Sequence, residues 1–151
     1  MSMKKRGGQY FYEYKFITTF EETNLVGNIY FANYLLWQGK CREMFLYEYC
    51  PDVIEEISKG LLLITLDVSA QYISQLFAFD TVVMKMSLEA QSSNRLQMSF
   101  EYYKEEKDGG KLTLVCKGTQ GAASMRVVNG NMVPVSFPES MVQVLQDYEF
   151  I

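Results

Sequence analysis

The side chains that could carry chemistry are limited first by composition, because none of the 151 residues is histidine. A chain without histidine cannot form a Ser–His or Cys–His nucleophile pair, use a histidine general base or bind a metal through imidazole. Its cysteines, Cys41, Cys50 and Cys116, are odd in number and show no CxxC spacing, which indicates free buried thiols in a reducing compartment. Chemistry is therefore expected from amides, hydroxyls, carboxylates, arginine and backbone groups.

Asn24 lies in the segment 21–28 (EETNLVGN), which is rich in turn-forming residues. Taken alone, this asparagine predicts a turn, and Gly27 supplies a residue free to adopt positive φ. A carboxamide has no useful basicity, but it can donate a hydrogen bond to an oxyanion. The backbone N–H of Phe31, in the first turn of a predicted helix, is a second donor at the positive end of the helix dipole.

One long helix is the main element expected after the first strand. Residues 10–17 alternate with period 2 and predict a half-buried strand. Asn28 is a suitable N-cap for a helix that starts near Ile29. From there to about Tyr49 the chain has no proline and is apolar on nearly every side, which predicts a helix buried along most of its length. Pro51 ends or restarts that helix.

Four later segments alternate with period 2 and are joined by short polar turns, which predicts antiparallel hairpins. Their apolar positions are Ile64, Leu66, Val68, Ala70 and Tyr72, then Val82, Met84, Met86 and Leu88, then Leu96, Met98, Phe100 and Tyr102, and finally Leu112, Leu114 and Cys116. In the first of these segments Thr65 and Asp67 share the opposite, polar face. A tight turn at 128–131 and a terminal helix at 138–146 follow. We predict a single α+β domain, 1–151, in which a curved antiparallel sheet wraps around one helix.

Charge and hydropathy exclude several classes of partner. The formal net charge is −4, from 14 Lys and Arg against 18 Asp and Glu, which disfavours binding to nucleic acid or an anionic membrane surface. There is no run of 18 apolar residues and no signal-peptide pattern, so we expect a soluble, cytoplasmic protein. The ten Phe, eleven Tyr and nine Met indicate a roomy apolar cavity, a self-association surface or an ordinary aromatic core.

Residues 20–35 (FEETNLVGNIYFANYL) resemble the loop and helix start of hotdog-fold thioesterases of the 4-hydroxybenzoyl-CoA type. The similarity continues through residues 37–46 (WQGKCREMFL), which look like the enediyne polyketide thioesterase branch, whose members release a polyene from a carrier protein. It covers about residues 12–138. The resemblance implies the hotdog fold, an antiparallel sheet around one long central helix. It also implies a homo-oligomer, a dimer or a dimer of dimers, with acyl sites at subunit interfaces.

The resemblance also implies roles for particular residues. The larger family has a catalytic aspartate at the position of Asn24, whereas the enediyne branch shares the asparagine. By this likeness Asn24, Arg42 and Thr65 are catalytic, and Gly27, Tyr30, Phe31, Tyr34 and Glu43 bind substrate. Glu43 and Asp67 are the candidates for a residual base, although each is also a normal solvated residue.

Arg42 lies 11 positions past Phe31, roughly 16 Å along a helix axis at 1.5 Å per residue. We therefore expect it to orient a β-keto carboxyl group, the carrier arm or a neighbouring subunit's site, unless it merely pairs with Glu43 or another acid.

The function implied is hydrolysis of a β-keto polyene or polyketide thioester on an acyl carrier protein or a synthase carrier domain, as in enediyne-type natural product biosynthesis. No metal or organic cofactor is implied. Two alternatives remain, a generic acyl-CoA thioesterase and a non-catalytic acyl-binding hotdog protein. Scattered rather than clustered Lys and Arg residues argue weakly against a site for coenzyme A.

Overall fold

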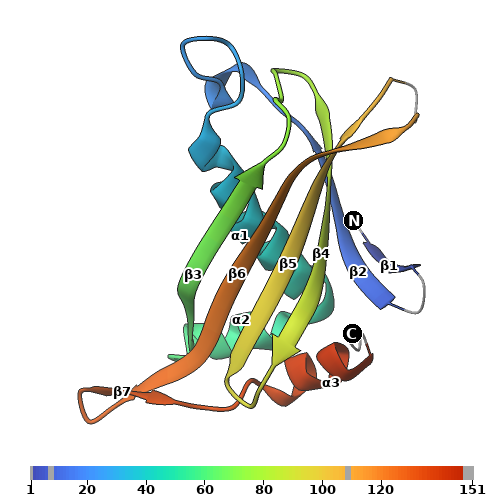
Figure 1. Cartoon of the computed structure of the whole chain (residues 1–151). Helices are drawn as coiled ribbons and strands as arrows, with labels where there is room; N and C mark the ends of the chain where they lie inside the picture. The colour runs from blue at the N-terminus through green and yellow to red at the C-terminus, as the bar shows by residue number, and fades with distance from the viewer. Residues whose placement is uncertain (1, 7–8, 108–109, 148–151) are drawn as a thin grey trace.

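A curled antiparallel sheet with one long helix against its inner face forms the body of the protein (Figure 1). The computed structural model describes residues 2–6, 9–107 and 110–147. The strands are β1 (Ser2–Arg6), β2 (Gln9–Ile17), β3 (Leu62–Tyr72), β4 (Thr81–Gln91), β5 (Arg95–Glu105), β6 (Leu112–Val128) and β7 (Asn131–Pro134). Their order is β1-β2-β4-β5-β6-β3, and β7 pairs with β6. The predicted α+β class and the wrapped sheet are confirmed, with β1 and β7 as additional strands.

The helices are α1 (Phe31–Tyr49), α2 (Pro51–Ser58) and α3 (Glu139–Asp147), and a 3-10 turn, η1, spans Phe20–Glu22. The predicted long helix is confirmed, but its start is two residues later than Ile29 and its N-cap is Tyr30. Asn28 does not cap it, because Asn28 forms an isolated antiparallel bridge with Phe77. Pro51 occupies the start of α2, as expected from its fixed φ.

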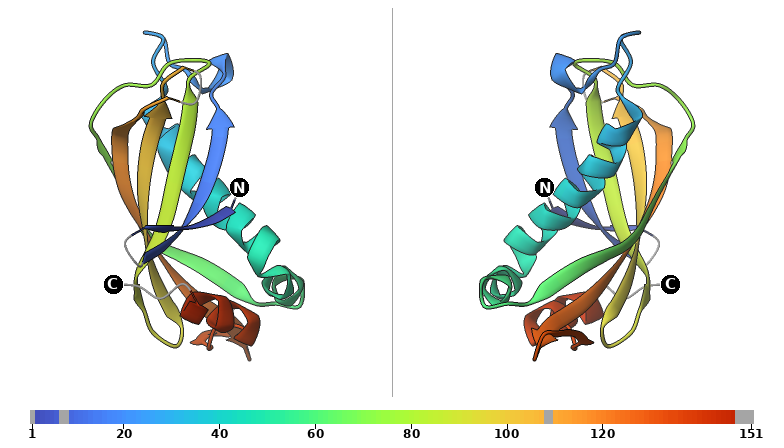
Figure 2. Two further views of the ribbon diagram at one scale, coloured as in Figure 1. Left: turned by 90° about the vertical axis from the view of Figure 1, so that its right-hand side faces the viewer. Right: turned by 90° about the vertical axis from the view of Figure 1, so that its left-hand side faces the viewer.

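Only one side of α1 is buried. The buried residues are Tyr34, Trp37, Gln38, Cys41, Phe45 and Leu46, and they face the sheet. Leu36 and Tyr47 are 67% and 68% exposed, so the prediction of burial along most of the helix is wrong for the opposite side. Figure 2 shows the reason, since the sheet curls past α1 on one side and leaves the other side uncovered.

β4 and β5 bear the predicted alternation. On β5, Leu96, Met98, Phe100 and Tyr102 are buried against α1, while the residues between them are only partly buried. With Val82, Met84 and Leu88 of β4 these side chains form the sheet's contribution to the core. β4 and β5 pair from Thr81 opposite Glu105 to Gln91 opposite Leu96, with a register shift between Leu88 and Ala90.

β3, at the edge of the sheet, departs from the predicted alternation. Its pairing with β6 is interrupted by a bulge, with Thr65 opposite Ala122 and Asp67 opposite Gly121. An extra residue reverses the side on which later side chains lie, so Thr65 and Asp67 are on opposite faces. Asp67 lies outside, with both carboxylate oxygens 3.1 Å from the position of a Cβ built at Gly121. The prediction that Thr65 and Asp67 share a face is therefore wrong.

The far end of the sheet is closed by α2, α3 and the β6–β7 hairpin. Asn129 and Gly130 have φ of 51° and 79°, which suits the tight turn predicted there. The predicted terminal helix is confirmed as α3. Among the helices of the described residues, none has the length and apolarity needed to cross a membrane.

Candidate active site

The loop that contains Asn24 is fixed to the start of α1 by Glu22. One carboxylate oxygen of Glu22 accepts a hydrogen bond from the Trp37 indole N–H at 2.7 Å, and the other accepts from the Thr19 N–H at 2.9 Å. The Glu22 carbonyl accepts from the Asn33 amide at 2.8 Å. Because these donors come from both sides of the loop, the loop has a defined position relative to the helix.

Asn24 itself occupies an Asx turn. Its Oδ1 accepts a hydrogen bond from the Val26 N–H at 2.9 Å, and its carbonyl accepts from the Gly27 N–H at 3.0 Å. Gly27 has φ of 94°, a conformation that suits glycine. The turn uses only the oxygen of the amide, so its NH₂ group is the part that can donate to a ligand. The turn interpretation is confirmed, and the role of Asn24 as an oxyanion donor stays a prediction.

The first turn of α1 lies beside this loop and supplies the second candidate donor. The N–H of Phe31 has no acceptor within the helix, as is usual for the first four residues. The Phe31 carbonyl accepts a hydrogen bond from the Tyr72 hydroxyl at 2.8 Å, and the Tyr72 ring meets that of Tyr34 edge-on at 5.0 Å. Tyr72 was not identified from the sequence, because this contact joins residues 41 apart and depends on the bulge in β3.

Tyr30 and Tyr34 differ in environment although both were predicted to bind substrate. Tyr30 is exposed, with its ring 4.6 Å from that of Phe31 and tilted by 43°, whereas Tyr34 is buried. Burial raises the pKa of Tyr34 to about 12, so this phenol is neutral at physiological pH and does not act as a base. Gly27 and Phe31 are exposed with Tyr30 around the loop, which leaves this end of α1 accessible.

Arg42 and Thr65, predicted together, are brought into contact. The Nη1 of Arg42 donates to Gln120 Oε1 at 2.8 Å and to Thr65 Oγ1 at 3.3 Å. Within the described part of the chain, the buried Nε of Arg42 has no hydrogen-bond partner. Desolvation lowers the pKa of Arg42, and the charge of Glu43 partly opposes this. A guanidinium that stays charged and is poorly solvated favours a nearby anion.

One helical turn before Arg42, a buried amide joins α1 to β3. Gln38 is fully buried, and its Nε2 donates to the Ser69 carbonyl at 2.9 Å. Gly118 makes room for this crossing, because a Cβ there would lie 2.3 Å from Gln38 Nε2. Gln38 and Gln120 were both missed from the sequence, where the only signal was a polar residue in an otherwise apolar pattern.

The remaining candidates belong neither to the Asn24 loop and first turn of α1 nor to the cluster of Arg42, Thr65 and Gln120. Glu43 is exposed on α1, next to Arg42 in sequence. Asp67 lies on the outer face of the sheet, away from Thr65. Cys41 is fully buried and its pKa is raised by desolvation, which disfavours the thiolate. Asn24 and Arg42 are separated by most of α1, so one chain does not bring them together.

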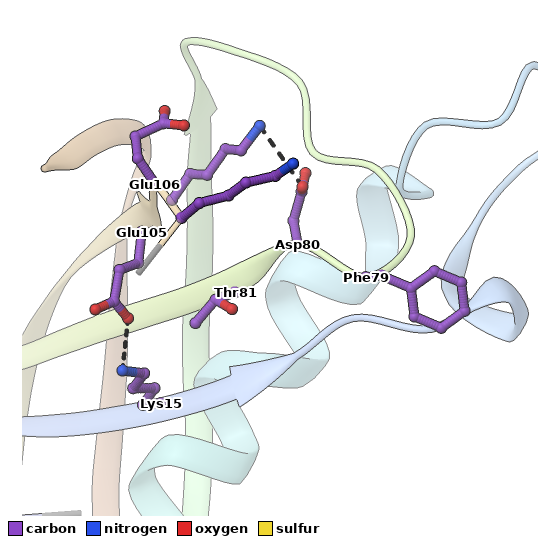
Figure 3. A pocket seen from close by; sticks show the side chains of 8 residues that line it. Lys15, Phe79, Asp80, Thr81, Glu105 and Glu106 are labelled. Carbon is purple, nitrogen blue, oxygen red and sulfur yellow. Dashed lines mark ion pairs between the residues drawn. The ribbon is translucent and has the colours of Figure 1, made fainter. Parts of the chain in front are cut away.

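A polar cavity of about 300 Å³ lies apart from these residues, at the ends of β2, β4 and β5 (Figure 3). It is lined by Lys15, Phe79, Asp80, Thr81, Lys104, Glu105, Glu106 and Lys107. Two of its three lysines form ion pairs with carboxylates, with Lys15 Nζ 2.6 Å from Glu105 and Lys104 Nζ 3.6 Å from Asp80. Equal numbers of opposite charges give this cavity no preference for an anionic thioester carrier.

Comparison with known proteins identifies the family. Residues 18–145 match the family model of the thioesterase-like superfamily. The chain belongs to this superfamily. A search of curated protein sequences found no match.

Several solved structures have the same fold. The dynemicin thioesterase, from a study of polyene binding to that enzyme, is 39% identical, with 93% of this chain and 99% of that chain covered and a TM-score of 0.87. A hypothetical protein from Aquifex aeolicus is 25% identical, with coverages of 88% and 98% and a TM-score of 0.75. The 4-hydroxybenzoyl-CoA thioesterase of Pseudomonas sp. strain CBS-3 is 10% identical, with coverages of 88% and 97% and a TM-score of 0.72, and shows the shared fold alone. The resemblance to hotdog thioesterases is confirmed, and family membership supports thioester hydrolysis as the activity.

Proposed function

We propose that this protein hydrolyses the thioester of a long, unsaturated β-keto polyketide chain carried on an acyl carrier protein, in enediyne-type natural product biosynthesis. The observation that carries the proposal is the Asn24 Asx turn, in a loop that Glu22 fixes beside the exposed first turn of α1. The 39% identity to the dynemicin thioesterase, whose crystal structures reveal effects of polyene binding, supports the unsaturated chain.

The reaction would depend on oxyanion stabilisation. Water attacks the thioester carbonyl carbon, the carbonyl oxygen takes up negative charge, and the Asn24 NH₂ and Phe31 N–H donate to it. The C–S bond then breaks, the acyl group leaves as an acid, and a proton from water ends on the released thiol. Glu22, a carboxylate in the Asn24 loop, already accepts hydrogen bonds from the Trp37 indole N–H and the Thr19 N–H, which disfavours its use as a base, so turnover is expected to be slow.

A second copy of the chain would complete this site. β3 is an exposed edge strand of 11 residues, and an unpaired edge is a template for pairing with another strand. An antiparallel β3–β3 pair related by a two-fold axis would bring the Arg42 and Thr65 group of one copy toward the Asn24 loop of the other. Arg42 would then orient the β-keto group or the carrier arm. Two such dimers would form the tetramer expected from the resemblance.

The cell compartment proposed is the cytoplasm. Cys41, Cys50 and Cys116 are free and buried, a state that a reducing compartment preserves.

A non-catalytic acyl-binding protein is the second candidate. It is favoured by the Asx turn, because this turn gives Asn24 a structural role that needs no catalysis. Hydrolysis and non-catalytic binding can be distinguished with one acyl group presented on acyl carrier protein and on coenzyme A, because only hydrolysis releases a free thiol.

The experiment compares a β-keto polyenoyl thioester on acyl carrier protein with the same acyl group on coenzyme A, and measures released thiol. We expect faster release from the carrier protein. Faster release from coenzyme A would instead assign a general acyl-CoA thioesterase. Binding of both substrates without any thiol release would establish the non-catalytic alternative.

A further inference from the structure

Exposed apolar side chains gather at two places that lie at opposite ends of the β3 edge. The first is the hairpin arm, which we define as residues 126–134 of β6 and β7. Here Val127, Val128 and Met132 are 57%, 48% and 53% exposed. The second is the segment 73–79 that follows β3, where Ile73 is 52% exposed. Contiguous exposed apolar residues on a soluble protein commonly mark an interaction surface.

The hairpin arm continues beyond the point where β3 begins. Leu62, the first residue of β3, is opposite Met125 of β6, so the arm starts at that level and extends further. Figure 1 shows the arm projecting from the sheet on the side of β3. A two-stranded hairpin is only marginally stable in water, and the exposed side chains of Val127, Val128 and Met132 add little to its stability within the chain. Packing against a partner would bury them.

The base of the arm is held by Arg126. Its Nη2 forms an ion pair with Glu56 of α2 at 2.7 Å, and its Nη1 donates to the Lys59 carbonyl at 3.2 Å. These contacts fix the direction of the arm relative to α2 before any partner binds. A preorganised arm costs less conformational entropy on association than a mobile one.

The segment 73–79 is joined to the loop that contains Asn24. The Ile29 N–H donates to the Leu76 carbonyl at 2.8 Å, and Asn28 forms its bridge with Phe77. A surface that packs on 73–79 therefore acts directly on the segment between Asn24 and the first turn of α1.

Two-fold symmetry brings these surfaces together. In an antiparallel β3–β3 pair, the Leu62 end of one strand lies beside the Tyr72 end of the other. The arm of one copy passes beyond Leu62, and Ile73 of the second copy follows Tyr72 in the same direction. The rest of the segment 73–79 then crosses the end of the sheet, because the Ser74 N–H binds Val115 of β6 and the Phe79 N–H binds Thr18 after β2. β6 is separated from the partner strand by β3 alone, roughly 10 Å at two strand spacings. Apolar side chains on the arm and on 73–79 can fill that distance.

We propose that the hairpin arm of each copy packs on residues 73–79 of a second copy and braces the partner's Asn24 loop. The partner is thus a second copy of this chain, and each candidate site is supported by an arm from the other protomer. This inference rests on the edge-to-edge dimer of the proposed function, but it assigns the arm a task that pairing of β3 alone does not need.

Chemical cross-linking tests the arm. Ile73→Cys and Val128→Cys are combined in one chain and treated with a flexible bis-maleimide. The native cysteines are buried, so the engineered thiols are the reactive pair, and the unsubstituted chain controls for this. Within one chain the two positions cannot be linked, because the Ile73 N–H binds Val115 and Val128 lies roughly 43 Å further along β6 at 3.3 Å per residue.

We expect most of the double variant to form covalent dimers, and little dimer from either single variant, because the two arms lie at opposite ends of the interface. A matched pair, Ser99→Cys with Val128→Cys, places the first thiol in the middle of β5 and should remain uncross-linked. If light scattering shows a dimer but the double variant cross-links no more than this control pair, the proposed packing of the arm on residues 73–79 is wrong. A monomeric mass would overturn the arm and the dimer together. Neither the cross-linking nor the light-scattering result depends on hydrolysis. Failure of the proposed activity would appear only in the thiol-release assay, so the two failures can be told apart.

Discussion

The Asn24 side chain uses only its Oδ1 in the Asx turn. Its NH₂ group is not needed for the turn and can donate to a ligand. We predict that Asn24→Ala lowers thioester hydrolysis about 10²-fold, the usual loss for one oxyanion donor. Released thiol measures the rate, and circular dichroism with the melting temperature verifies the fold. Unchanged hydrolysis by a folded Asn24→Ala protein would remove Asn24 from the mechanism.

Asn24→Asp separates the donor from the turn, because a carboxylate still accepts the Val26 N–H but cannot donate. We predict hydrolysis no faster than that of Asn24→Ala, since a negative charge opposes the oxyanion. The same assay on acyl-CoA and acyl carrier thioesters measures it. A large gain on acyl-CoA would contradict this and reveal a site in which a carboxylate base still functions.

Arg42 is a desolvated cation whose protein partners in the described residues, Thr65 and Gln120, are neutral. We predict that Arg42→Ala reduces hydrolysis of β-keto substrates by about 1.5–3 kcal/mol in activation free energy, the value of a charged hydrogen bond. A matched saturated acyl thioester should be affected much less. A uniform decline of both substrates with a lower melting temperature would instead mean that Arg42 is structural.

At the scale of elements, α1 and β3 are joined by the Gln38 amide, which passes over Gly118. We predict that Gly118→Ala destabilises the fold by about 1–3 kcal/mol, because the added Cβ meets Gln38 Nε2 and the Ser69 carbonyl at 2.3 and 2.6 Å. Denaturant unfolding measures this free energy.

Gly39→Ala is the matched control for that prediction. It lies next to Gln38 on α1 with no atom within 4 Å of an added Cβ. Alanine in a helix interior should therefore leave stability unchanged or raise it by about 0.5–1 kcal/mol. Equal stability of the Gly118→Ala protein and the unsubstituted protein would show that the crossing of Gln38 tolerates a methyl group.

At the scale of the whole molecule, the sheet ends in an exposed β3 and leaves one side of α1 uncovered. We predict a homo-oligomer, and a tetramer of edge-paired dimers at high concentration, because closed symmetry removes unpaired edges. Light scattering across a dilution series measures the mass. A mass near 17.5 kDa throughout would exclude every shared site.

Local patterns in the sequence determined the long helix, the alternation of β4 and β5, the hairpin turn at Asn129–Gly130 and the loop around Asn24. These features depend on periodicity and on turn residues a few positions apart, so a single sequence is enough to predict them. The motif in residues 20–46 also indicated the family.

The tertiary structure decided the placement of Thr65 and Asp67 and the roles of Tyr72, Gln38 and Gln120. The bulge in β3 is a property of its pairing with β6, and an alternation pattern alone does not reveal where a strand gains an extra residue. The hydrogen bond from Arg42 to Gln120 joins residues 78 apart, and the one from Tyr72 to Phe31 joins residues 41 apart. Such contacts exist only once the sheet has curled around α1, because packing, and not local propensity, selects which distant polar groups meet.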